Sequence, residues 1–213
     1  MSAFLGPIHY WLYNKIQLME NMEKAIIARI DTPQVKAIST SVQNEIVPFL
    51  PEAALDQLID TSNIHGWLQE QIINVETRQA LLIKHIADIN GNEIYDLVND
   101  VYTEFGKASA KDADIKNSED MADIFNKLNN YLLEGMPCDR VNQVIENSLV
   151  TFIWETSQCV HTKNWSVAEI PVERYYEFRA SFINGFVKGV NSNLSYKYTN
   201  NDKQLHVIKK EIS

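Results

Sequence analysis

Apolar residues recur every three or four positions along most of the first hundred residues, a spacing that is typical of amphipathic helices. Pro7 and Pro33 suit the first turn of a helix, where a preset φ is favourable. The predicted helices span about residues 8–30, 33–46, 64–89 and 93–105. Because the connections are short, we expect residues 1–106 to form two helical hairpins packed as a four-helix bundle.

A five-residue pattern, Ile-His-x-Trp-Leu, occurs twice, at residues 8–12 and at residues 64–68. At the same offset of 56 residues, eight of the 23 positions from 8 to 30 are identical. Chance alignment would give about one or two identities at ordinary residue frequencies. The matched residues include His9 with His65, Trp11 with Trp67 and Glu20 with Glu76. We interpret the two copies as an internal duplication of one hairpin.

The spacing of apolar residues changes after residue 106, where the predicted bundle ends. Residues 107–117 are small and charged and lack periodicity, so we expect a linker there. Residues 118–213 are expected to form an α+β domain with a small strand-helix-hairpin unit. Its predicted elements are a helix over 118–133, a strand over 149–156, a long helix after Pro171 and a hairpin over 194–208. The predicted fold class is therefore mainly α, with an α+β C-terminal part.

The repeated polar residues lie on the apolar face of each predicted helix. His9 and Glu20 are about 16 Å apart along one helix, so they cannot bind one metal ion together. The first and third helices of an up-down-up-down bundle run parallel, which would place His9 level with His65 and Glu20 level with Glu76. A bis-imidazole pair of this kind suits haem or a transition metal, and the glutamates are candidate further ligands.

Trp11 and Trp67 are the candidate cofactor contacts beside these histidines. The same residues also have a structural interpretation, since a His near a helix start often caps the helix and a Glu usually pairs with Lys or Arg. Glu20 and Glu76 lack a His three residues later, which disfavours a di-iron carboxylate site.

A second candidate metal site is the Cys-x-His stretch. Cys159 and His161 would share one face if the chain there is extended, and Cys138 could supply a third ligand. Two alternatives remain open for Cys159: a buried core residue, or a nucleophile that works with His161 and Glu155.

Aromatic residues are dense along the long helix after Pro171, at a spacing typical of a core face. An inward-facing Arg179 would pair with a ligand carboxylate or with Glu155. Trp154 is a further candidate cofactor contact. The chain has no phosphate-binding loop, nucleophile elbow or zinc-protease motif, which disfavours nucleotide enzymes and serine hydrolases.

The composition limits the cellular compartment and the classes of partner that we expect for this protein. The chain of 213 residues carries a net charge of −9, which argues against a nucleic-acid partner. No apolar run is long enough for a membrane span, the start does not read as a signal peptide, and there are only two cysteines. We therefore expect a cytoplasmic protein with no membrane partner.

The sequence favours a cytoplasmic sensor or regulatory protein that binds a small ligand or a metal, with haem or a transition metal as the cofactor. One alternative is a non-catalytic interaction module with a protein partner or as a homo-oligomer. The other, less favoured, is a small cysteine-dependent enzyme.

Overall fold

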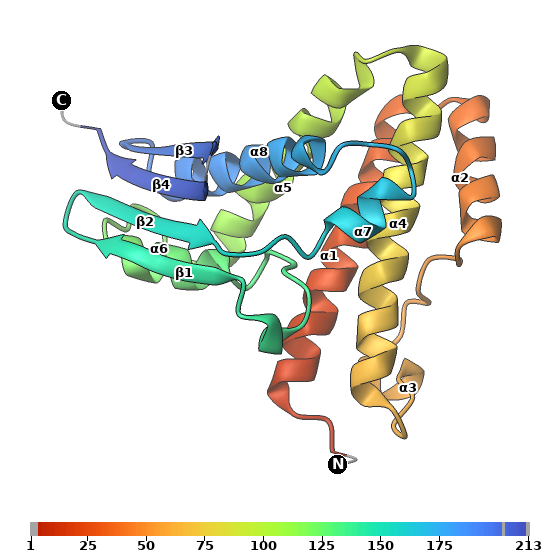
Figure 1. Ribbon diagram of the computed structural model, residues 1–213, viewed down its shortest axis with the longest axis horizontal. Helices are drawn as coiled ribbons and strands as arrows, with labels where there is room; N and C mark the ends of the chain where they lie inside the picture. Colours follow the sequence, from red (N-terminus) through yellow and green to blue (C-terminus); the bar gives the residue numbers. More distant parts are fainter. Residues whose placement is uncertain (1–3, 202, 212–213) are drawn as a thin grey trace. The chain divides into compact units, whose positions relative to one another are not determined.

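The computed structural model of the chain describes residues 4–201 and 203–211. This part is mostly helical and carries a C-terminal four-stranded antiparallel sheet, as the predicted fold class requires (Figure 1). The helices are α1 (Pro7–Ile30), α2 (Pro33–Glu45), α3 (Leu55–Leu58), α4 (Ile64–Asn90), α5 (Ile94–Asp112), α6 (Met121–Leu128), α7 (Thr162–Ser166) and α8 (Val172–Val190). The strands are β1 (Asn142–Asn147), β2 (Thr151–Thr156), β3 (Leu194–Asn200) and β4 (Gln204–Lys210), and Pro137–Asp139 forms a 3-10 turn.

The described chain divides into two compact units, each built from several segments. Unit 1 contains the chain up to Tyr95, with Leu133–Cys138 and His161–Val172. Unit 2 contains Asp96–Leu132, Asp139–Val160 and the chain from Glu173 on. The first half of the predicted linker, up to Asp112, is the last part of α5.

Helix α4 is the centre of unit 1. It packs against α1, α2 and α7, and every residue from Val75 to Ile83 is buried. Figure 1 shows α1 and α4 running side by side in the same direction. A helix that is covered on all sides must bury its polar residues as well as its apolar ones, so each buried polar group on α4 requires a partner.

The break between α1 and α2 has a local cause. Asp31 adopts a left-handed conformation with a φ of 46° and ends α1. The Thr32 hydroxyl then accepts a hydrogen bond from the Val35 amide at 3.2 Å, and Pro33 occupies the first turn of α2. Capping and proline together set this boundary, as predicted.

The predicted four-helix bundle and the duplicated hairpins are not confirmed. Three of the expected helices, α1, α2 and α4, pack together in unit 1, whereas α5 belongs to unit 2 from Asp96 on. Glycines explain why α5 packs against α8. A Cβ on Gly106 would lie 2.0 Å from the Phe182 carbonyl oxygen, and one on Gly185 would lie 2.3 Å from the Thr103 carbonyl oxygen. These two helices therefore touch through their backbones.

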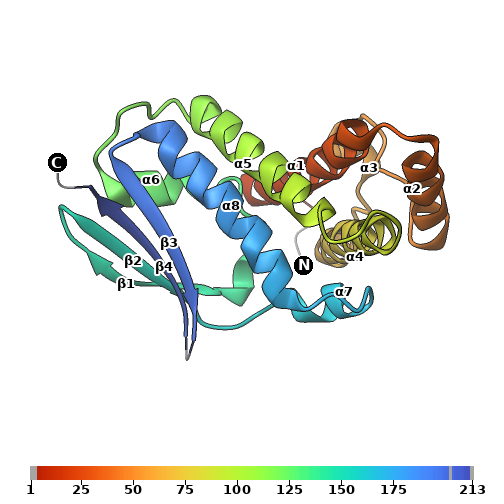
Figure 2. The ribbon, with the colours of Figure 1, turned by 90° about the horizontal axis from the view of Figure 1, so that it is seen from above.

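The sheet of unit 2 has the strand order β1-β2-β4-β3. Figure 2 shows α5, α6 and α8 on one side of it. Phe152 and Trp154 of β2 are buried, and they pair in register with Ile208 and His206 of β4. The predicted strand and the C-terminal hairpin are confirmed as β2 and as β3 with β4. Strand β1 was not predicted, because its residues are exposed and show no alternation.

None of the helices in residues 4–201 and 203–211 combines the length and the apolar content that crossing a membrane requires.

Candidate functional site

The structure brings the two repeated histidines together at the start of α1 and α4. The Nε2 atoms of His9 and His65 lie 3.3 Å apart, and the ring centroids are 5.4 Å apart with the planes inclined at 47°. The parallel direction of α1 and α4 places equivalent residues of the repeat at the same height. His9 is partly exposed and His65 is exposed, so both rings are accessible from solvent.

His9 also has the capping role that was the structural alternative. The Gly6 amide donates a hydrogen bond to His9 Nδ1 at 2.9 Å, and the His9 amide donates to the Gly6 carbonyl oxygen at 3.0 Å. An Nδ1 that accepts a hydrogen bond carries no proton, so neutral His9 holds its proton on Nε2. His9 Nε2 therefore donates to His65 Nε2.

The two tryptophans of the repeat both pack against residues of α1. The Lys15 ammonium lies 3.3 Å from the centroid of the Trp11 ring, a cation–π contact. The Trp67 ring lies 6.3 Å from that of Tyr13. Their predicted role as cofactor contacts stays a prediction.

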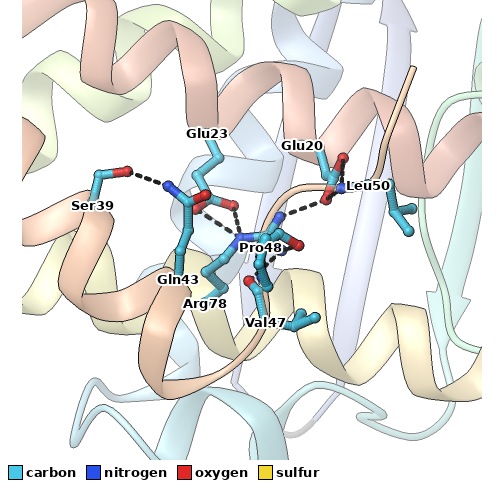
Figure 3. A network of polar contacts seen from close by, with 8 residues as sticks. All are labelled: Glu20, Glu23, Ser39, Gln43, Val47, Pro48, Leu50 and Arg78. Atoms are coloured by element: carbon cyan, nitrogen blue, oxygen red, sulfur yellow. Dashed lines mark hydrogen bonds and ion pairs between the residues drawn. The ribbon is translucent and has the colours of Figure 1, made fainter.

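Deeper in unit 1, Arg78 of α4 holds two glutamates of α1 (Figure 3). Its Nη2 donates to Glu20 Oε1 at 2.7 Å, and its Nε donates to both oxygens of Glu23 at 3.1 and 3.0 Å. The Arg78 side chain is 1% exposed. The Leu50 amide donates to both oxygens of Glu20, at 3.1 and 3.3 Å. Glu20 is therefore bonded to Arg78 and Leu50, and the expected pairing with Glu76 is not made.

One guanidinium facing two carboxylates leaves a local excess of negative charge. Burial raises the pKa of Glu23 to about 7, against the opposing effect of Arg78. The Arg78 guanidinium also lies 4.5 Å from the centroid of the Phe49 ring, and its Nη1 donates to the carbonyl oxygens of Val47 and Pro48 at 3.4 Å each. Arg78 thus connects α1 and α4 to the segment that follows α2.

Glu76, two residues before Arg78, lies among different partners. His161 Nδ1 and Glu76 Oε1 are 2.9 Å apart, and Asn164 Nδ2 donates to Glu76 Oε2 at 2.9 Å. On the other side of the ring, His161 Nε2 lies 3.5 Å from Glu134 Oε2. The one-turn spacing of His161 and Asn164 at the start of α7 lets both reach one carboxylate. Glu76 and His161 are both buried, so this cluster ties α7 to α4.

The Cys-x-His stretch does not have the extended conformation that its proposed metal site required. Strand β2 ends at Thr156, and His161 sits at the N-cap of α7 with a φ of −98° and a ψ of −24°. Cys159 is exposed and contacts the Tyr176 hydroxyl, so the alternative of a buried core cysteine is wrong. His161 instead faces Glu76.

Cys138 is exposed in the 3-10 turn, and both cysteines are free thiols. Across the residues that the structure describes, no three His, Cys, Asp or Glu side chains are grouped as a metal ion would need.

In unit 2, four residues form one directional chain of hydrogen bonds, with one residue from each strand of the sheet. The Tyr196 hydroxyl and His206 Nδ1 are 2.7 Å apart, His206 Nε2 and the Thr156 hydroxyl are 3.2 Å apart, and the Thr156 hydroxyl donates to Asn142 Oδ1 at 3.0 Å. Because Thr156 donates to Asn142, it accepts from His206 Nε2, and Tyr196 donates to Nδ1.

Trp154 and Arg179, the other predicted cofactor contacts, are buried in the same cluster. The Trp154 ring stacks on the His206 ring with centroids 4.7 Å apart and planes inclined at 5°. Burial, assisted by the charge of Arg179, lowers the pKa of His206 well below its usual value. Glu155 pairs with Lys203 at 2.9 Å. Its pairing with Arg179 stays a prediction.

Sequence reasoning found the two glutamates but missed their partners. Arg78 carried little signal, because it lies inside the polar run from Glu76 to Gln79, which is typical of an exposed stretch. Asn164 and Glu134 carried none, because they come from distant segments that only the fold brings to Glu76 and to His161, respectively.

Comparisons of the chain with protein families, with curated proteins and with solved structures give no match. Inferences about function therefore start from the contacts described above.

Proposed function

We propose that the protein is a metal-binding regulatory protein in which His9 and His65 hold a transition metal ion through their Nε2 atoms. The observation that carries this proposal is the 3.3 Å separation of those atoms. Zinc–imidazole bonds of about 2.0–2.1 Å at a tetrahedral angle place two nitrogens about 3.3–3.4 Å apart. Ligands on opposite sides of an ion, as in bis-histidine haem, would need about 4 Å at similar bond lengths. The separation therefore favours a tetrahedral ion such as Zn²⁺ over haem.

Metal binding at this pair would alter the start of α1. A neutral imidazole that binds metal through Nε2 carries its proton on Nδ1. In His9 that proton would point at the Gly6 amide, which now donates to Nδ1. The occupied state therefore loses this capping bond, and the first turn of α1 reports metal occupancy. Two imidazoles fill two of four positions, so water or a second copy of the chain completes the site.

The test is a Zn²⁺ titration of the full chain, purified without a metal-affinity tag, with a chromophoric chelator as competitor. We expect stoichiometric binding that weakens at least about a hundredfold in His9→Ala/His65→Ala, a loss of about 2.7 kcal/mol. His85→Ala is the matched control, because His85 is an exposed histidine of α4. Unchanged affinity in the double variant, or no binding by the native chain, would overturn the proposal.

We place this function in the cytoplasm because Cys138 and Cys159 are exposed free thiols, which persist in a reducing compartment. We also propose that α1 and α4 are the two copies of a duplicated hairpin helix. Their parallel course and the pairing of His9 with His65 support this origin.

An interaction role is the second candidate function, and strand β1 favours it. Among the described residues β1 pairs with β2 alone, so it forms an edge of the sheet. Ile145 and Leu149 beside that edge are 53% and 93% exposed. Pairing with β1 of a second copy would satisfy the edge and cover these side chains. Sedimentation of the native chain and of Ile145→Lys tests this: a dimer that the substitution does not weaken would exclude pairing through β1.

A further inference from the structure

A polar pocket of about 470 Å³ lies in unit 1, between α1 and the non-helical segment Leu50–Ala54. Gln17, Glu20, Asn21 and Lys24 line it from α1. Their spacing of three and four residues places them on neighbouring turns along one side of the helix. The volume is within the range of small-molecule sites, roughly 300–1,000 Å³.

The wall of this pocket is fixed before any ligand arrives. The Leu50 amide is held by the carboxylate of Glu20, whose charge is matched by Arg78 at 2.7 Å. At the other end of the segment, the Tyr13 hydroxyl donates to the Ala53 carbonyl oxygen at 3.3 Å. A pre-ordered wall lowers the entropic cost of binding, which distinguishes this pocket from a mobile surface hollow.

The charges that face the pocket are of both signs. Glu20 is already paired with Arg78, so the charged groups left on the lining are the ammonium of Lys24 and the carboxylate of Glu52, accompanied by the amides of Gln17 and Asn21. A ligand with only positive or only negative charge would meet a like charge at one of the two groups. A small molecule with one carboxylate and one ammonium would satisfy both.

We propose that this pocket binds a free α-amino acid, with its carboxylate paired to Lys24 and its ammonium paired to Glu52. The Gln17 and Asn21 amides supply further hydrogen bonds to the same polar end of the ligand. The site is separate from the histidine pair, and neither the metal proposal nor its test bears on it.

Calorimetric titration of the full chain with each proteinogenic amino acid tests this inference. Succinate, with two carboxylates, and putrescine, with two ammoniums, are the charge controls. We expect at least one amino acid to bind with a Kd of about 1 mM or tighter, and both control compounds to bind at least about tenfold more weakly. Absence of amino-acid binding, or equal binding of succinate or putrescine, would overturn the inference.

Variants separate the pocket from nonspecific charge effects. Lys24→Met and Glu52→Gln should each weaken binding of that amino acid by about tenfold or more. Lys36→Met and Glu45→Gln are matched controls, because both residues are exposed on α2, and they should leave the Kd unchanged. Lys24→Arg keeps the charge and should retain most of the affinity. Full affinity in both Lys24→Met and Glu52→Gln would show that the ligand binds elsewhere.

Discussion

Arg78 Nη2 and Glu20 Oε1 lie 2.7 Å apart in an ion pair whose side chains are 1% and 5% exposed. A charge pair this deeply buried is retained only where each group also has further hydrogen bonds. Glu20 has the Leu50 amide and Arg78 has Glu23, so the pair is the middle of a larger network. The stability of unit 1 should therefore respond sharply to the loss of one member.

Arg78→Met should lower the free energy of unfolding by about 3–5 kcal/mol, because it leaves two buried carboxylates without a cation. Urea denaturation at neutral pH measures the change. Adding Glu20→Gln and Glu23→Gln in the same chain should restore part of the loss, since neutral amides need no counter-charge. Lys36→Met, which removes an exposed ion pair with Asp31, should leave stability nearly unchanged, because solvent screens that pair. A similar small effect for Arg78→Met would contradict the prediction.

Glu23 should make the protein less stable as the pH rises. Its pKa is about 7 in the folded protein and 4.5 as a free group, so the folded state binds the proton more tightly. Its contribution is complete below about pH 4.5 and is lost between about pH 4.5 and 7, by at most about 3 kcal/mol. Urea unfolding of the native chain and of Glu23→Gln at several pH values should show a difference that changes across this window. Glu45→Gln, an exposed control, should follow the native curve.

His206, in contrast to Glu23, should make the protein less stable as the pH falls. Burial lowers its pKa below the ordinary value of 6.5, so the unfolded state binds this proton more tightly. Its contribution is complete above about pH 6.5 and is lost as the pH falls below that value. His206→Gln keeps a donor and an acceptor but does not titrate, and its stability should fall less on acidification than that of the native chain. The exposed His85→Gln should leave the acid dependence as it is; parallel native and His206→Gln curves would contradict the assignment.

The hydrogen bond between Asn164 and Glu76 can be tested by exchanging the donor and the acceptor. Asn164→Asp places a second carboxylate beside Glu76, and Glu76→Gln places an amide beside the amide of Asn164. Each change alone should cost about 1–3 kcal/mol, because a buried polar group loses its partner. The double change recreates the bond in the reverse direction and should recover part of the loss. Strictly additive costs in a double-mutant cycle would show that the two side chains do not interact.

The histidine pair could be predicted because it depends on local geometry. Two copies at one offset, on helices that run parallel, place His9 and His65 at the same height whatever else the fold contains. The partners of the glutamates depend instead on which segments cross α4. The run from Thr156 to His161 illustrates the difference, because a turn into α7 carries His161 to Glu76.

The predicted four-helix bundle is not confirmed, because α5 belongs to unit 2 from Asp96 on. The apolar stripe of an amphipathic helix indicates that one side is buried, but it does not indicate which neighbour covers that side. A small residue permits the contact with the actual neighbour: Gly185 of α8 allows close approach, and the helix that approaches it is α5, at Thr103. Strand β1 left no signal because its side chains are exposed on both faces.

Glu76 and Arg78, two residues apart on α4, bind partners on different sides of the helix, the first with α7 and the second with α1. A turn of α4 about its axis by a single residue, about 100°, would take both charges away from their partners at once. A slide of one residue, about 1.5 Å, would separate both sets of hydrogen bonds. The contacts of Glu76 and Arg78 therefore fix both the rotation of α4 about its axis and its position along that axis. Ligand binding at the first turn of α4 can bend or cap the helix but cannot rotate it.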